Sequence, residues 1–205
     1  MTAVPLLLDL TDRAVVCVGA GPVASAKVLP LVEAGADVTV IAPDAEERLV
    51  AEVLWEARPY RRGDLDRDPP VMLVVAATGV SHVDRAVARE ARDRGIWCLR
   101  AEGQGDVVMP SVVRRGGLLL AAATGAPALT RRVRMRLEEV FDDRWGDTAT
   151  LLARLRDDQR VRRALGVVAR DERRRRWRTV VERCLDGGDG PLDERQARHL
   201  LEHGG

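Results

Sequence analysis

The residues with the clearest chemical role lie near the start of the chain, where Gly19, Gly21 and Ala24 follow an apolar run at residues 15–18. A buried strand, a glycine turn and a helix in this order bring the diphosphate of a dinucleotide against backbone N–H groups at a helix N-terminus. Gly19 permits the tight turn, Gly21 leaves room for phosphate oxygens, and Ala24 lets the helix pack closely on the sheet. The spacing therefore predicts a dinucleotide-binding turn.

The sequence beyond the turn predicts the rest of a βαβ unit. Residues 26–34 have helical spacing, Gly35 follows as a stop, and residues 37–41 form a second apolar strand. Glycine turns also occur in doubly wound proteins that bind nothing, so the complete unit is what favours nucleotide binding.

The residue that would bind the cofactor ribose is less clearly defined. In Rossmann-type domains an acid at the end of the second strand, roughly twenty residues past the glycines, binds the 2′-hydroxyl. Here Ile41, Ala42 and Pro43 occupy that place, and Asp44 follows. Asp44 either reaches the ribose or caps the next helix, and the sequence leaves both open. Because no arginine directly follows the strand to bind a 2′-phosphate, NAD is favoured over NADP.

Composition sets outer limits on the class of protein. With 205 residues, 46% of them hydrophobic, and a net charge of +1, we expect one solid core plus a smaller unit, and no nucleic-acid partner. No apolar run approaches the roughly twenty residues of a membrane span, so we expect a cytoplasmic protein without a membrane partner. Cys17, Cys98 and Cys184 lack metal-ligand spacing, which predicts buried reduced thiols and no metal site.

The remaining elements predict an α/β protein with a helical C-terminal part. An apolar strand at residues 71–77 ends at Thr78 and precedes a helix at residues 81–94. The other expected elements are an extended segment near residues 53–60, strands at residues 96–99 and 118–123, a helix after Pro127, helices from residue 148 onward, and a break at residues 187–191. Dense charge in the last part is typical of solvated helix faces.

Segments along nearly the whole chain match one known family. They are residues 5–10, 19–24 with Lys27, 33–36, 42–43, 63–65, 76–78, 109–113 with Arg115, 127–131 and 172–177. In order and spacing the chain resembles the precorrin-2 dehydrogenase and sirohydrochlorin ferrochelatase module of siroheme synthases, which occurs alone or fused to a methyltransferase.

The resemblance implies a Rossmann-type NAD domain over residues 1–112, a small α+β dimerisation segment over residues 113–147 and a helical domain over residues 148–205. It also implies a homodimer in which NAD⁺ removes a hydride from precorrin-2, a tetrapyrrole, to give sirohydrochlorin. The implied cofactor contacts, in addition to Gly19 and Gly21, are Pro22, Val23, Pro43 and Asp44, with Ala77 and Thr78 close to the nicotinamide.

A tetrapyrrole that carries many carboxylates needs several cations around a wide pocket. Arg115, Thr124 and Arg131 are the predicted substrate-binding residues, and Arg114, Arg132 and Arg134 lie beside them. The alternative is that these arginines are surface charges.

Loss of a hydride is accompanied by loss of a proton, which a base must accept. The family has an aspartate after the strand that corresponds to residues 96–99, and alignment on that strand puts Glu102 in its place. A different placement of the loop gap puts Leu99 or Arg100 there instead, and Asp106 becomes the acid.

The family's Ser-Pro pair is replaced by Ala126 and Pro127. We therefore expect dehydrogenase activity, and ferrochelatase activity is the less supported of the two. A dinucleotide-sensing module without catalysis and a dehydrogenase of another substrate are the alternative hypotheses.

Overall fold

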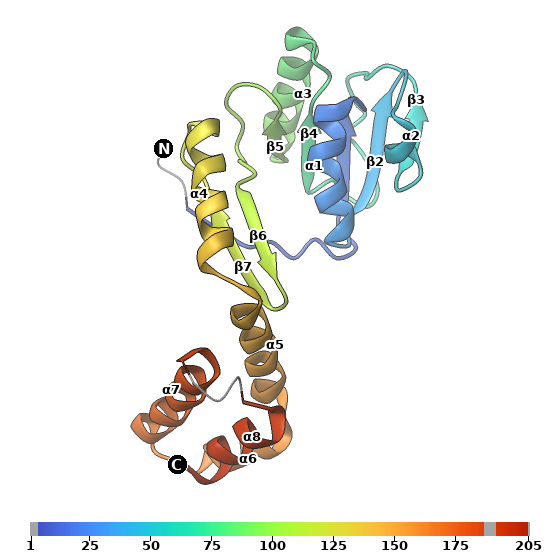
Figure 1. Cartoon of the computed structure of the whole chain (residues 1–205). Helices are drawn as coiled ribbons and strands as arrows, with labels where there is room; N and C mark the ends of the chain where they lie inside the picture. The colour runs from blue at the N-terminus through green and yellow to red at the C-terminus, as the bar shows by residue number, and fades with distance from the viewer. Residues whose placement is uncertain (1–3, 187–191, 205) are drawn as a thin grey trace. The chain divides into compact units, whose positions relative to one another are not determined.

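The computed structural model describes residues 4–186 and 192–204 (Figure 1). The described residues up to Met109 form one compact unit, and those from Pro110 onward form a second.

The first unit is built on a five-stranded sheet in the order β3-β2-β1-β4-β5, and every pair of neighbours is parallel. The strands are β1 (Ala14–Val18), β2 (Asp37–Ala42), β3 (Leu54–Ala57), β4 (Leu73–Ala76) and β5 (Trp97–Arg100). The chain runs outward from β1 to β3 and then returns to place β4 on the other side of β1. This reversal of strand order makes the carboxyl edge between β1 and β4 the topological switch point.

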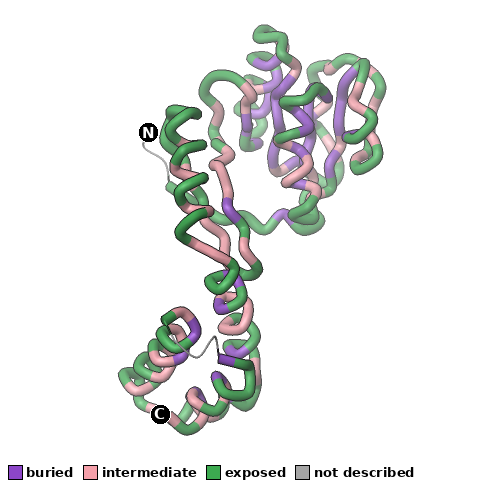
Figure 2. The backbone as a smooth tube through the Cα atoms, viewed as in Figure 1, coloured by how far each residue is buried: buried purple, intermediate pink, exposed green. Residues whose placement is uncertain are grey.

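Helices cover both faces of this sheet. Alternate residues of β1 point to opposite sides, so Cys17 packs in one core with α1 (Pro22–Glu33) and α2 (Glu47–Val50). Val18 packs in the other core with α3 (Ser81–Arg94). Figure 2 shows that the buried positions of this unit are concentrated in the strands. Apolar runs without alternation are what a parallel sheet covered on both faces requires, and the predicted Rossmann-type α/β fold is confirmed.

Helix bounds follow the sequence signals closely. The predicted helix at residues 81–94 has the same bounds in the structure, and it ends at Gly95 with a φ of 69°. The first helix begins at Pro22, directly after the glycine turn, because proline suits the first helical turn, where its missing N–H would have no intrahelical acceptor.

The second unit begins with a two-stranded antiparallel sheet, β6 (Ser111–Arg115) and β7 (Leu118–Ala122). Only β7 was predicted as a strand, because β6 ends in two arginines and carries a short apolar stretch. Helix α4 (Pro127–Val140) packs against both strands, yet none of its residues is buried (Figure 2).

Four helices complete the second unit: α5 (Asp143–Asp157), α6 (Gln159–Gly166), α7 (Arg170–Asp186) and α8 (Glu194–His203). Their core includes Leu155, Val161, Val180 and Leu201, all of them nearly inaccessible to solvent. The helical run starts at Asp143, earlier than the predicted residue 148. The predicted break at residues 187–191 lies outside the described residues.

Helix α5 meets the β6–β7 hairpin at a glycine. A Cβ added to Gly146 would lie 2.4 Å from the backbone oxygen of Arg115, whereas a Cβ on Gly166 of α6 would meet no atom within 4 Å. Although both glycines lie in helices, only Gly146 is needed for close packing against another element.

We predict opposite effects of alanine at these two positions. Gly146→Ala lowers the free energy of unfolding by about 1–3 kcal/mol, since the hairpin backbone must move. Gly166→Ala raises it by up to about 1 kcal/mol, since alanine is the better helix former. Urea unfolding followed by circular dichroism measures both, and equal effects of the same sign would contradict this packing.

Candidate functional site

The glycine turn lies at the switch point, directly between the ends of β1 and β4. Gly19 has a φ of 104°, and its N–H donates to the Ile41 oxygen of β2 at 3.0 Å. On the other side, the Ala77 N–H donates to the Val18 oxygen at 2.9 Å. The turn is therefore fixed to both neighbouring strands.

The two glycines of the turn have different roles. A Cβ on Gly19 would lie 2.3 Å from the Ala77 oxygen, so the fold itself requires glycine there. A Cβ on Gly21 would meet nothing within 4 Å. The space beside Gly21 is open, and this is the space that a diphosphate would fill.

The N-terminus of α1 is suited to an anion. Gly21 is its N-cap, no side chain caps the helix, and the Ser25 N–H is bonded to the Gly21 oxygen at 3.0 Å. The N–H groups of the preceding helical residues have no acceptor within the helix. Of the predicted contacts here, Pro22 begins the helix and Val23 is 54% exposed. These residues fit a dinucleotide diphosphate.

Pro43 and Asp44 follow β2 directly and are exposed, so they lie at the same carboxyl edge of the sheet. The alternative role of Asp44 as a helix cap is wrong, because the N-cap of α2 is Glu46.

Thr78 is held at this edge by a buried carboxylate that the sequence analysis missed. Asp84, only 4% exposed, accepts from the Thr78 N–H at 3.0 Å and from its hydroxyl at 2.7 Å, both with Oδ1. The signal was an acid in the first turn of the helix after a strand. Ala77 and Thr78 are thus fixed beside Gly19.

The thiol of Cys17 lies beneath the turn and donates to the Gly19 oxygen at 3.2 Å. Burial, with a smaller contribution from the negative charge of Asp84, raises the pKa of Cys17 to about 12. All three cysteines are free and buried, as predicted. Cys17 therefore acts as a neutral packing group and not as a nucleophile.

The two candidate acids differ in their contacts. Asp106 Oδ2 accepts from the Cys98 N–H at 3.2 Å, and the Asp106 N–H donates to the Cys98 oxygen at 2.8 Å. Asp106 therefore holds its loop against β5. Glu102 is exposed, and among the residues that the structure describes no hydrogen bond engages its side chain.

Glu102 and Thr78 both follow the carboxyl ends of neighbouring strands, β5 and β4. Arg100 of β5 pairs with Ala76 of β4, and the Ala101 N–H donates to the Ala76 oxygen at 2.9 Å. Glu102 and Thr78 each lie two residues beyond that pair. Both therefore emerge at the carboxyl edge where the glycine turn lies.

The predicted substrate residues belong to the second unit. Arg115 of β6 has its Nε 3.4 Å from Asp143 Oδ1. The Thr124 hydroxyl donates to the Ala126 oxygen at 2.9 Å and lies 2.7 Å from the Thr130 hydroxyl, which shapes the turn into α4. Arg131 is exposed on α4.

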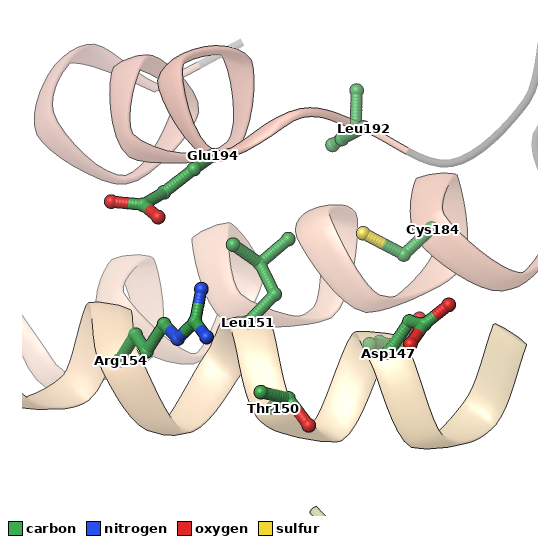
Figure 3. Close-up of a pocket in the computed structure, with 8 residues that line it drawn as sticks. Asp147, Thr150, Leu151, Arg154, Cys184, Leu192 and Glu194 are labelled. Carbon is green, nitrogen blue, oxygen red and sulfur yellow. The ribbon is translucent and has the colours of Figure 1, made fainter. Parts of the chain in front are cut away.

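A hollow of about 350 Å³ lies in the helical part of the second unit (Figure 3). Its lining contains none of the predicted site residues; it comprises Asp147, Thr148, Thr150, Leu151, Arg154, Cys184, Leu192 and Glu194. Burial raises the pKa of the Cys184 thiol.

In the described part of the chain, no group of three or more His, Cys, Asp or Glu residues is placed to hold a metal ion. None of the described helices has the length and apolar character to cross a membrane.

The parallel sheet has helices on both faces and an open glycine turn at its switch point. Together these features define a Rossmann-type dinucleotide-binding domain. Comparison with known families agrees: the model of a family described as "Putative NAD(P)-binding" matches residues 6–111. The chain belongs to this NAD(P)-binding family.

Curated relatives extend the similarity to almost the whole chain. The siroheme synthase of Methylobacillus flagellatus is 34% identical over 98% of this chain and 44% of its own length. That of Azotobacter vinelandii is 33% identical over 98% and 44%, and that of Methylococcus capsulatus is 34% identical over 91% and 39%. The chain thus spans less than half the length of these relatives. They confirm the resemblance to the siroheme synthase module.

A solved structure of similar fold is that of a precorrin-2 dehydrogenase, SirC. It is 21% identical, has a TM-score of 0.75, and the match covers 98% of this chain and 99% of that one. At this identity the likeness shows a shared fold.

We predict that alanine separates the roles of the two glycines. Gly21→Ala leaves the free energy of unfolding within about 0.5 kcal/mol but weakens dinucleotide binding at least about tenfold, because its methyl group fills the open space. Gly19→Ala lowers the free energy of unfolding by about 2 kcal/mol or more, because of its backbone conformation and the contact with Ala77. Urea unfolding and calorimetric titration measure the two effects. Unchanged binding by Gly21→Ala would contradict the assigned diphosphate site.

Proposed function

We propose that this chain is an NAD-dependent dehydrogenase that oxidises precorrin-2 to sirohydrochlorin. The observation that carries the proposal is the open glycine turn at the switch point, with Thr78 and Glu102 at the same edge. The names of the siroheme synthase relatives and of the fold neighbour support the choice of substrate. The reaction converts precorrin-2 and NAD⁺ to sirohydrochlorin, NADH and a proton.

The first unit supplies the dinucleotide site. When bound, NAD⁺ accepts a hydride from the substrate. The N–H groups at the start of α1 bind the diphosphate, and Pro43 with Asp44 lies against the adenosine half. Asp84 fixes Thr78 through two hydrogen bonds, so Ala77 and Thr78 form a rigid floor beside the nicotinamide.

Glu102 is the base that we assign to the released proton. It is exposed at the carboxyl edge, whereas the Asp106 carboxylate already accepts a backbone N–H. A carboxylate that is not occupied by a backbone donor has its lone pairs available for the substrate proton.

Recognition of the substrate is assigned to the second unit. Arg115 and Arg131 provide guanidinium groups for peripheral carboxylates, and Thr124 adds a hydroxyl at the turn before α4. Because the family's serine is Ala126 here, we assign oxidation as the better supported activity and iron insertion as the less supported one. Reduced buried thiols support a cytoplasmic location.

We further propose that residues 113–147 form a dimerisation segment, with residues 1–112 as the NAD domain and residues 148–205 as the helical domain. Helix α4 carries apolar side chains but buries none of them in the chain itself. Leu129, Met135 and Val140 are 54%, 40% and 49% exposed. A second copy of the chain would cover them in a homodimer.

The dimer proposal predicts that Met135→Glu shifts the protein from dimer to monomer, because the change places a charge in an apolar interface. Val167→Glu is the matched control, since Val167 is 90% exposed in the helical part. Light scattering after gel filtration measures both masses. A monomeric wild-type protein, or a dimer that Met135→Glu leaves intact, would rule the proposal out.

The proposed reaction predicts that the protein converts precorrin-2 and NAD⁺ to sirohydrochlorin with equal amounts of NADH, followed by absorbance. Glu102→Gln lowers kcat about a hundredfold or more and leaves the affinity for NAD⁺ unchanged. Asp106→Asn has the smaller effect on kcat, since the Asn oxygen still accepts the Cys98 N–H.

Three outcomes would change this assignment. If Asp106→Asn has the larger effect on kcat, Asp106 is the base. Dinucleotide binding without turnover and without affinity for tetrapyrroles would favour a sensing module. Turnover of another substrate in place of precorrin-2 would reject the substrate but keep the dehydrogenase.

A further inference from the structure

Arg100 is the last residue of β5, and its side chain lies over the loop that follows the strand. A Cβ added to Gly103 would lie 3.1 Å from Nη1 and 3.3 Å from Cζ of Arg100, so the guanidinium lies directly against this glycine. The charge of Arg100 is therefore at the carboxyl edge of the sheet, beside the loop that carries Glu102.

The hydrogen-bonding capacity of this guanidinium is almost unused. Among the residues that the structure describes, the side chain donates one hydrogen bond, from Nη1 to the Gln104 oxygen at 3.4 Å, and no carboxylate pairs with it. Its Nε is buried and has no acceptor there. A guanidinium has five N–H donors and stays charged at every physiological pH. Buried polar groups in native proteins are almost always bonded, so this partly buried cation points to a ligand that supplies acceptors.

We propose that Arg100 binds a peripheral carboxylate of the substrate, next to Glu102. The inference rests on the proposed function, since it takes the tetrapyrrole as the ligand and Glu102 as the base. A carboxylate can accept from Nη1 and Nη2 together, which is the strongest pairing that a guanidinium forms. Arg100 would thus add a substrate contact within the unit that carries the base.

Other arginines of the first unit do not offer the same contact. Arg58 is also partly buried, but its Nη1 lies 2.8 Å from Asp64 Oδ2, so its charge is already paired. Arg92 is exposed and belongs to the last turn of α3. Because α3 runs back from the carboxyl edge to the start of β5, Arg92 lies at the opposite edge of the sheet.

Substitution of Arg100 tests the contact without removing a structural ion pair. Arg100→Met keeps an unbranched apolar side chain, removes the charge and the unbonded Nε, and loses only the long hydrogen bond to Gln104. Arg100→Lys keeps the charge but lacks the planar pair of donors. Arg92→Met is the matched control, since it removes the same charge at the opposite edge.

The experiment measures the dissociation constant of sirohydrochlorin by absorbance titration, together with KM and kcat for precorrin-2. The oxidation leaves the peripheral carboxylates in place, so the product reports the same contact as the substrate. We expect Arg100→Met to weaken sirohydrochlorin binding and to raise KM at least about tenfold, with kcat close to the wild-type value, because the carboxylate takes no part in hydride transfer.

The comparison variants should behave differently. Arg100→Lys weakens binding by a smaller factor, and Arg92→Met leaves it unchanged. All three variants keep the wild-type unfolding midpoint and the wild-type affinity for NAD⁺, measured by calorimetry.

The outcomes separate this inference from the proposed function. A wild-type protein that neither binds sirohydrochlorin nor oxidises precorrin-2 overturns both. Sirohydrochlorin binding that Arg100→Met weakens no more than Arg92→Met does overturns the role of Arg100 and leaves the proposed function standing. A lower kcat with unchanged binding would mean that Arg100 acts only through the loop of Glu102, and a loss of NAD⁺ affinity would assign it to the cofactor. Either result overturns the proposed contact.

Discussion

The close backbone contact between Gly19 and Ala77 is the constraint on which the whole edge of the sheet depends. Only a residue without a Cβ lets the turn after β1 approach the end of β4 this closely. The contact sets the direction in which α1 leaves the sheet and thus where its free N–H groups point. It also places Ala77 and Thr78 next to the turn, so both parts of the proposed cofactor site share a single rigid base.

Two acids outside the glycine turn adjust its surroundings in different ways. Asp84 is buried and accepts two hydrogen bonds from Thr78 with Oδ1, so it contributes rigidity on the β4 side. Glu46 lies on the β2 side and uses only part of its acceptor capacity on Ser25. At the carboxyl edge of the sheet, the buried Asp84 therefore positions Thr78, whereas the half-buried Glu46 remains available to a ligand. The two acids differ in burial and not in chemical type.

The sequence predicted the βαβ unit, the Rossmann-type parallel sheet and the bounds of α3, because apolar runs and glycine stops are local signals. It missed β6, because the two arginines at the end of this strand interrupt its apolar pattern. It named Asp44 as a candidate for the ribose contact and did not single out Glu46, whose side-chain position depends on a hydrogen bond between two residues 21 positions apart, which no local pattern reveals. Asp84 was also missed, although an acid in the first turn of the helix after β4 is a local signal.

The sulfur atom of Cys17 has a consequence for chemistry at this edge. Burial raises the pKa of Cys17 to about 12, so the thiol stays protonated at neutral pH. Peroxides and other electrophiles react with the thiolate, so this sulfur resists conversion to sulfenic acid although it lies directly under the glycine turn. The domain thus keeps a compact, polarizable side chain in the core beneath the glycine turn, where it is protected from oxidation.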